Sequence, residues 1–253
     1  MTLPVHSAAI AFRQGQVMLF ASTAFHRAAY PVGKLLMPAL YFATARMPGT
    51  AASSANEAAG QAWRILSATR PAHAGTVSVL SQAIEIAGRL DILVNNAGLY
   101  QYAPLHDITT ASFRDHFDLN LLGPLLMMRE AARVMGEDGG SIINIGSVAM
   151  RALIPSTAIY AGSKAALGAF TTVFAKELAP RGIRVNIIHP GPVDTEGARN
   201  GGLMGGDWEK QLVAMTPLGR FGQVADVTPA ALFLALGDAR WITGEVLYVT
   251  GGL

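Results

Sequence analysis

The sequence contains no cysteine, so disulfides, thiolate catalysis and cysteine-bound metals are excluded. Charged residues make up only 14% of the 253 residues, the formal net charge is +2, and no stretch gathers five or six basic side chains. Because nucleic-acid binding relies on clustered positive charge, we expect no nucleic-acid partner. The absence of cysteine also fits a reducing compartment, and we expect a cytoplasmic protein.

Long apolar runs are missing as well. The richest one, residues 35–45, is shorter than the roughly 18 residues of a membrane-spanning helix and is interrupted by Pro38. The first twelve residues have no basic segment before their apolar side chains, so we expect no signal peptide and no membrane association. The six histidines show no spacing typical of metal ligands, and we expect no catalytic metal.

The chain is 51% hydrophobic and has no repeat, low-complexity tract or linker, which predicts a single domain over residues 1–253. Short apolar segments alternate with longer helical ones. Strands are predicted over residues 17–20, 40–43, 63–66, 90–94, 141–145, 185–188 and 246–249. Helices are predicted over residues 76–87, 110–135, 156–178 and 226–236. This alternation predicts an α/β fold with a doubly wound parallel sheet, whose ligands bind beyond the carboxyl ends of the strands.

Tyr160 and Lys164 lie four residues apart in the helix predicted over residues 156–178, so their side chains share one face. A neighbouring ammonium favours the phenolate and lowers the pKa of a phenol, which is ordinarily about 10. The pair therefore indicates an acid/base unit. A helix with one packed tyrosine and one solvated lysine is the simpler interpretation of this spacing taken alone.

Polar or rigid residues follow three of the predicted strands. Asn95-Asn-Ala-Gly98 follows the strand at 90–94, Gly146 and Ser147 follow the strand at 141–145, and residues 189–195 add two prolines and a glycine after the strand at 185–188. Each motif taken alone is typical of an ordinary turn. They fall, however, at the edge of the sheet where ligands bind, which indicates a shared site.

At these positions the chain resembles the short-chain dehydrogenase/reductase family, and within it the 3-oxoacyl carrier-protein reductases. The matching motifs are Asn95-Asn-Ala-Gly98, Asn120 within residues 118–123, Ser147, Tyr160-x-x-x-Lys164, residues 190–195 and the terminal residues 242–252. The resemblance covers roughly residue 88 to the end. It implies a Rossmann-like fold, a homo-oligomer (a dimer or tetramer, of which we expect the homotetramer), and reversible hydride transfer between a nicotinamide cofactor and a ketone or secondary alcohol.

The resemblance implies catalytic roles for four residues. Tyr160 would exchange a proton with the substrate oxygen, Lys164 would lower the phenol pKa and hold the nicotinamide ribose, Ser147 would polarise the substrate oxygen, and Asn120 would position a water. Further cofactor contacts are implied for Asn95, Ala97, Gly98, Pro190, Gly191, Val193 and Thr195. The glycine-rich segment 196–215 would form a substrate lid, with apolar contacts from Leu203, Met204 and Trp208.

The family's glycine-rich turn, T-G-x-x-x-G-x-G, is missing. A count without gaps places residues 21–28 on this turn, with Ser22, His26 and Ala28 where glycines stand. Side chains at these positions block the approach of pyrophosphate to the backbone. Three explanations remain open: an unusual cofactor mode, a loss of cofactor binding, or a sequence error such as a local frame shift within about the first sixty residues.

Arg46 stands at the end of the predicted second strand, where an acidic residue would hold the ribose of NAD. An arginine here can meet the extra phosphate of NADP, although a solvated surface arginine is an equal alternative. NADP is therefore the expected cofactor, with NAD possible. Two functional hypotheses remain: an active NAD(P)-dependent oxidoreductase, favoured by the complete catalytic set, and a folded scaffold or binding protein with impaired cofactor binding, favoured by the missing turn.

Overall fold

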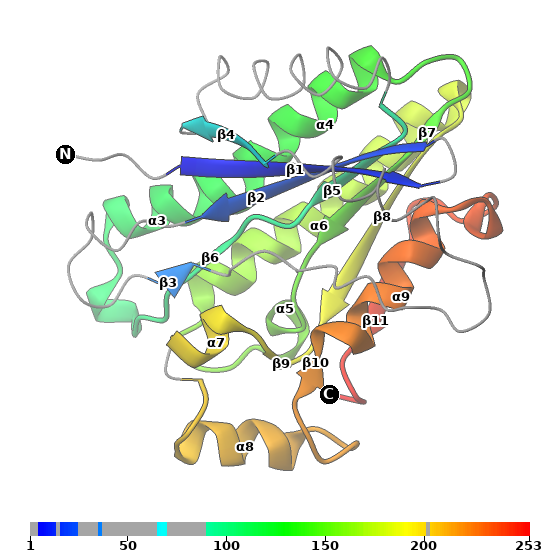
Figure 1. Cartoon of the computed structure of the whole chain (residues 1–253). Coiled ribbons are helices and arrows are strands. Elements are labelled where there is room, and N and C mark those ends of the chain that lie inside the picture. Colours follow the sequence, from blue (N-terminus) through cyan, green and yellow to red (C-terminus); the bar gives the residue numbers. More distant parts are fainter. Residues whose placement is uncertain (1–4, 14–15, 25–34, 37–64, 70–89, 201–202) are drawn as a thin grey trace.

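The computed structural model describes residues 5–13, 16–24, 35–36, 65–69, 90–200 and 203–253, the first four ranges by backbone alone. Its central element is a seven-stranded sheet with the order β11-β8-β7-β5-β2-β1-β4 (Figure 1). The strands are β1 (Val5–Arg13), β2 (Gln16–Ala24), β4 (Ile65–Thr69), β5 (Ile92–Asn95), β7 (Gly140–Ile145), β8 (Ile183–Pro190) and β11 (Val246–Val249). From β2 to β11 all neighbours pair in parallel.

Two short strand pairs lie outside this sheet. β3 (Leu35–Leu36) pairs antiparallel with β6 (Leu99–Tyr100), and β9 (Val193–Asp194) pairs in parallel with β10 (Gly222–Gln223). Both involve chain that directly follows a strand of the main sheet, so they fix the loops at its carboxyl edge.

Helices cover both faces of the sheet because the strand residues alternate in direction. Leu93, Ile142 and Ile187 pack with α4 (Gly123–Val134) and α6 (Ala158–Leu178) on one face. Their neighbours Val94, Ile143 and Ile188 pack with α9 (Val224–Ala235) on the other face. The predicted doubly wound α/β fold is confirmed.

The strands predicted near β2, β5, β7, β8 and β11 are confirmed, and the one predicted at 63–66 overlaps β4. The predicted strand 40–43 and helix 76–87 lie outside the described residues. The sheet is not parallel throughout, because the unpredicted strand β1 runs antiparallel to both β2 and β4. The register pairs Arg13 with Gln16, and strands joined by so short a connection must be antiparallel. The segment Val5–Arg13 mixes alanine with polar residues and so lacks the alternation that predicts a strand.

The single helix predicted over residues 110–135 is interrupted. The chain forms α3 (Thr110–Phe117), then a π-helical stretch η2 (Asp118–Leu122), then α4. Pro124, near the start of α4, has no backbone N–H to continue an α-helical ladder, which accounts for the break at this place. The remaining helical segments are η1 (Leu105–Asp107), α5 (Ala149–Ala152), η3 (Ala179–Arg181), α7 (Glu196–Asn200), α8 (Asp207–Met215) and η4 (Gly237–Ala239). In the described part of the chain, no helix is long and apolar enough to cross a membrane.

Candidate active site

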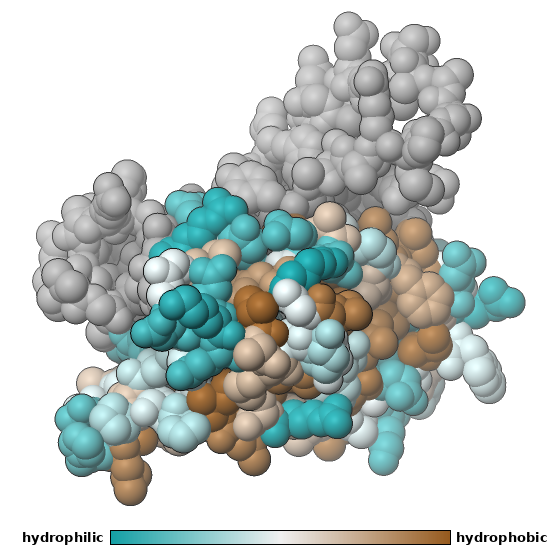
Figure 2. Space-filling view, turned by 90° about the horizontal axis from the view of Figure 1, so that it is seen from below, coloured by the Kyte–Doolittle hydropathy of each residue, from teal (hydrophilic) through white to brown (hydrophobic). Residues whose placement is uncertain are grey.

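The predicted site residues of the described chain gather at the carboxyl ends of β5, β7 and β8, beside α6. In Figure 1 this is the lower end of the sheet, where α5, α7 and α8 lie. Figure 2 looks onto this end from below and shows hydrophobic side chains exposed among hydrophilic ones. A surface of this mixed kind suits a small ligand with an apolar body and a few polar groups.

Lys164 is 2% exposed, although it carries an ammonium group. Its Nζ donates a hydrogen bond of 2.8 Å to the carbonyl oxygen of Ile145, the last residue of β7. Burial lowers the pKa of Lys164 to about 8. The residue is thus not the solvated lysine of the simpler interpretation. A buried ammonium without a carboxylate partner among the described residues is typical of functional sites.

Tyr160 is 5% exposed and lies one helical turn before Lys164 on α6. Burial raises the pKa of its phenol above the ordinary value, and a hydrogen bond with the Ser147 side chain offsets this only in part. The net shift is therefore upward, and a lowering of this pKa by Lys164 stays a prediction. Desolvation of the phenol dominates because the charged form loses its hydration in the protein interior.

Ser147 follows β7, and its backbone is fixed by His189 of β8. The Ser147 N–H and the His189 Nδ1 atom are 2.8 Å apart, and the imidazole is fully buried. Gly146 provides the space, since a Cβ there would lie 2.3 Å from His189 Nδ1. The sequence placed His189 only at the start of the turn-like segment 189–195, because nothing local shows which backbone a buried imidazole will meet.

Asn120 is fully buried in the π-helical stretch η2. Its Oδ1 accepts from the Leu99 N–H at 2.7 Å, and its Nδ2 donates to the Leu99 carbonyl at 2.8 Å and to Ser163 Oγ at 3.0 Å. Both amide hydrogens are therefore used within the protein. The side chain fastens the backbone at β6, and a water-positioning role for Asn120 stays a prediction.

Gly98 lies where these residues converge. A Cβ added there would be 3.4 Å from Lys164 Nζ and 3.6 Å from Asn120 Oδ1. Asn95 is buried, and its Nδ2 donates to Asn144 Oδ1 at 2.8 Å while its Oδ1 has no partner among the described residues. Ala97 is half-buried between them. The structure thus brings the Asn95–Gly98 motif, Asn120 and Lys164 into one cluster.

Four of the predicted cofactor contacts lie at the end of β8. Pro190 is the last residue of β8, and Gly191 fits only without a side chain, because a Cβ would lie 2.8 Å from the Thr250 backbone. Val193 belongs to β9, and the hydroxyl of Thr195 accepts from the Ala198 N–H at 3.1 Å. These residues end or follow β8 at the carboxyl edge of the sheet, as Ser147 follows β7, and their contacts with a nicotinamide stay a prediction.

The opposite end of a dinucleotide would lie near the segment counted onto the glycine-rich turn. Its first four residues, 21–24, belong to β2 and pair with residues 5–8 of β1. They form strand where the family has a turn, so the described residues show no phosphate cradle at this place. The rest of that segment and Arg46 lie outside the described residues.

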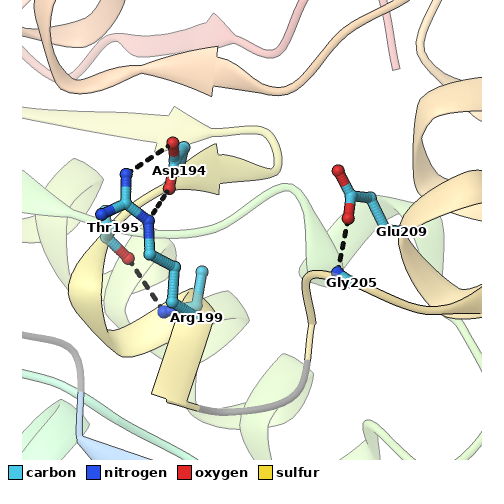
Figure 3. A network of polar contacts seen from close by, with 6 residues as sticks. Asp194, Thr195, Arg199, Gly205 and Glu209 are labelled. Carbon is cyan, nitrogen blue, oxygen red and sulfur yellow. Dashed lines mark hydrogen bonds and ion pairs between the residues drawn. The ribbon is translucent and has the colours of Figure 1, made fainter.

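The predicted lid segment, residues 196–215, contains α7 and α8. Arg199 of α7 holds Asp194 of β9 with two bonds of 2.7 and 2.8 Å, and its N–H donates to the Thr195 carbonyl (Figure 3). The Gly205 N–H donates to Glu209 of α8. Leu203, predicted as an apolar contact, packs against the cluster that contains Tyr160.

Two aromatic residues beside Tyr160 were missed by sequence reasoning. The rings of Tyr100 and Tyr102 lie 6.1 and 6.2 Å from the Tyr160 ring. Their position directly after the Asn95–Gly98 motif could have identified them as site residues, because side chains just beyond a strand's carboxyl end face the ligand site. Among the described residues, no group of three His, Asp or Glu side chains is placed to hold a metal ion.

Comparison with known proteins gives consistent matches. The family model described as Enoyl-(Acyl carrier protein) reductase matches residues 41–253. An uncharacterized oxidoreductase from Methylorubrum extorquens is 49% identical over 175 residues, 69% of this chain and 70% of that protein. Galactitol 2-dehydrogenase from Agrobacterium fabrum is 37% identical over 185 residues, 69% and 72% of the two chains. The crystal structure of a blue fluorescent protein from a metagenomic library, in complex with NADPH, superposes with a TM-score of 0.68 at 38% identity over 73% of each chain.

Proposed function

The chain belongs to the short-chain dehydrogenase/reductase family of NAD(P)-dependent oxidoreductases, and from this premise we propose that it interconverts a ketone and a secondary alcohol with Tyr160 as the acid/base. The observation that carries the proposal is the buried Tyr160 and Lys164 pair beside Ser147. The similarity to galactitol 2-dehydrogenase supports a secondary alcohol as the substrate class.

The bound cofactor supplies or accepts the hydride at the reacting carbon. In the reducing direction, Ser147 donates a hydrogen bond to the carbonyl oxygen, and Tyr160 gives that oxygen its phenolic proton. The raised pKa of Tyr160 keeps this proton on the phenol at neutral pH, which is the protonation state that the reducing direction requires. Lys164, mostly protonated below its pKa of about 8, then stabilises the phenolate that remains.

We propose NADP as the preferred dinucleotide, with Tyr160 and Lys164 holding the nicotinamide ribose. Lys164 uses one of its three donors on Ile145, which leaves two for ribose hydroxyls. Pro190, Gly191, Val193 and Thr195 would hold the carboxamide, and Asn95, Ala97 and Gly98 the adenosine ribose. Arg46 would meet the 2′-phosphate, and the solved neighbour that contains NADPH supports this preference.

A second candidate is a folded protein with impaired cofactor binding. The specific observation in its favour is that residues 21–24 form strand and not the glycine-rich turn that receives the phosphates. The two candidates differ in dinucleotide affinity. A titration of the purified protein with NADPH and NADH therefore separates them before any substrate is known.

We expect micromolar binding of NADPH, and NADPH oxidation that depends on an added ketone. Tyr160→Phe should lower kcat by about a hundredfold to ten-thousandfold, the range of general acid catalysis, without weakening NADPH binding to the same degree. The matched control is Tyr248→Phe, because the hydroxyl of Tyr248 makes only a weak hydrogen bond, 3.5 Å long, to the Met150 sulfur among the described residues. Folded protein that binds neither dinucleotide would establish the second candidate. Tyr160→Phe with full activity would refute the assignment of the acid.

A further inference from the structure

Residues 99–103 form an extended segment whose alternate backbone groups are anchored. Leu99 is bonded at both its N–H and its carbonyl by Asn120. The Gln101 N–H donates to His116 Nε2 at 3.0 Å, and the Ala103 N–H donates to the Ser156 carbonyl at 2.9 Å. Because His116 Nδ1 lies 2.8 Å from the Ser112 carbonyl, this imidazole donates there and accepts from Gln101. The backbone groups of Leu99, Gln101 and Ala103 therefore fix this segment to the surrounding fold.

The even-numbered residues of this segment, Tyr100 and Tyr102, project toward Tyr160. The three rings form a triangle with centroid separations of 6.1, 6.1 and 6.2 Å, and Tyr160 meets both neighbours edge-on. Leu203, from the segment after β9, packs against the same cluster. The Tyr160 ring is therefore bordered by two further tyrosine rings on an anchored segment.

The hydroxyl of Tyr100 is buried and has no hydrogen-bond partner among the described residues. A buried hydroxyl without a partner is costly, so such a group in a folded protein calls for an explanation. Burial, and to a lesser degree the charge of Tyr160, raise the pKa of Tyr100, so this hydroxyl stays neutral and able to donate. Tyr102 differs, since it is 40% exposed.

We propose that the Tyr100 hydroxyl binds a second oxygen of the substrate, on the carbon next to the reacting one, and so selects α-hydroxy ketones and vicinal diols. The Tyr100 and Tyr160 rings lie 6.1 Å apart, so a substrate held at Tyr160 lies next to the Tyr100 ring. The inference rests on the proposed function, because it assumes that Tyr160 bonds the reacting oxygen. It adds the substrate class and a specificity-determining residue.

The test compares matched ketones that differ by one hydroxyl: butan-2-one with 3-hydroxybutan-2-one, and cyclohexanone with 2-hydroxycyclohexanone. For each pair, kcat/KM with NADPH gives a selectivity ratio, and comparing this ratio between variants cancels the intrinsic reactivity of the ketones. We expect Tyr100→Phe to lower the ratio about tenfold or more, because the hydroxy ketone loses a buried hydrogen bond. Tyr102→Phe is the matched control, and its ratio should stay within about twofold of the wild-type value.

The possible outcomes separate the role of the Tyr100 hydroxyl from the proposed function. An unchanged ratio in Tyr100→Phe, or an equal fall in Tyr102→Phe, overturns the role of the Tyr100 hydroxyl. A wild-type protein that reduces both members of each pair with equal efficiency also overturns it, while the proposed function stands. A protein that reduces none of the four ketones and none of a wider panel contradicts the proposed function, and this inference falls with it.

Discussion

At the scale of the residue, the polar side chains beneath the site are held in neutral or unusual states by burial. His189 lies under Ser147 and stacks on Tyr248 at 5.1 Å. Burial lowers the pKa of His189, the Ser147 backbone raises it in part, and the charge of Lys164 lowers it further. His189 is therefore a positioning residue that stays neutral while it holds the backbone of the proposed Ser147 donor.

This state of His189 predicts a pH dependence of stability. The unfolded chain protonates this imidazole near its ordinary pKa of about 6.5, whereas the folded protein resists protonation. The free energy of unfolding should thus fall as the pH drops below about 6.5, by at most about 1.4 kcal/mol per pH unit from this one group. In His189→Gln, which cannot be protonated, this part of the decline should disappear in urea unfolding between pH 7.5 and 5.

The matched control is His106→Gln, since the His106 side chain is 80% exposed. It should follow the wild-type pH profile. An identical profile for His189→Gln and the wild-type protein would contradict the assignment. A kcat that also falls in His189→Gln, with KM little changed, would agree with the positioning of Ser147 because a misplaced donor weakens transition-state binding.

At the scale of the element, the segment after β8 is fastened to the rest of the fold by a short strand pair and two ion pairs. β9 pairs with β10, and Asp194 on β9 holds Arg199 on α7. Arg220 and Asp226 make a second pair, with bonds of 2.7 and 3.1 Å, next to β10. These contacts set the direction in which α7 and Leu203 approach the tyrosine cluster.

Arg199→Gln should loosen α7 without disturbing the core. Because the proposed lid would then be held less firmly over the site, KM for the ketone should rise by about threefold to tenfold, and kcat should change less. The matched control is Lys210→Gln, which removes an exposed pair with Asp207 on α8. Steady-state kinetics of both variants check this. Equal KM values in the two variants would show that the Asp194–Arg199 pair does not control the segment.

The elements that a local pattern encodes were predicted well, and those that depend on distant contacts were not. α6 and the strands β5, β7, β8 and β11 carry continuous apolar or periodic segments, so their type follows from neighbouring residues. The break at η2 has a local signal in Pro124, but the apolar spacing continues across it and predicts one unbroken helix. The strand β1 carries no such local pattern, because it depends on pairing with β2 and β4.

At the scale of the whole molecule, the family match begins at residue 41, and the missing glycine-rich turn, counted onto residues 21–28, lies before it. The antiparallel β1 lies in this first part of the chain and takes the place beside β2 in the sheet. The part of the chain that carries the proposed catalytic residues therefore lies within the family match. The first strands are where this chain differs, and the dinucleotide titration above measures the consequence.

We propose that the protein forms a homotetramer. β11 is an edge strand of the sheet, yet its Val246 and Leu247 are 39% and 36% exposed, and nearby Trp241 is 96% exposed. An edge strand with exposed apolar side chains is a ready surface for pairing with another copy. Light scattering should give four times the chain mass of 26.6 kDa.

Leu247→Lys should reduce this mass, because a charge at a buried subunit contact is costly. The matched control is Leu105→Lys, since Leu105 is 86% exposed on η1 and distant in sequence from β11. A monomer mass for the wild-type protein would refute the assembly. A tetramer that survives Leu247→Lys would place the contact elsewhere.

The sequence by itself determined the fold class, the order of the motifs and the positions of the proposed catalytic residues, because hydrophobic periodicity and motif spacing are properties of neighbouring residues. Only the tertiary structure decided the direction of the Tyr160 pKa, the use of the Asn120 amide on Leu99, the place of His189 under Ser147 and the buried hydroxyl of Tyr100. The physical reason is the same in each case. Desolvation and hydrogen-bond satisfaction depend on which distant residues surround a group once the chain has folded.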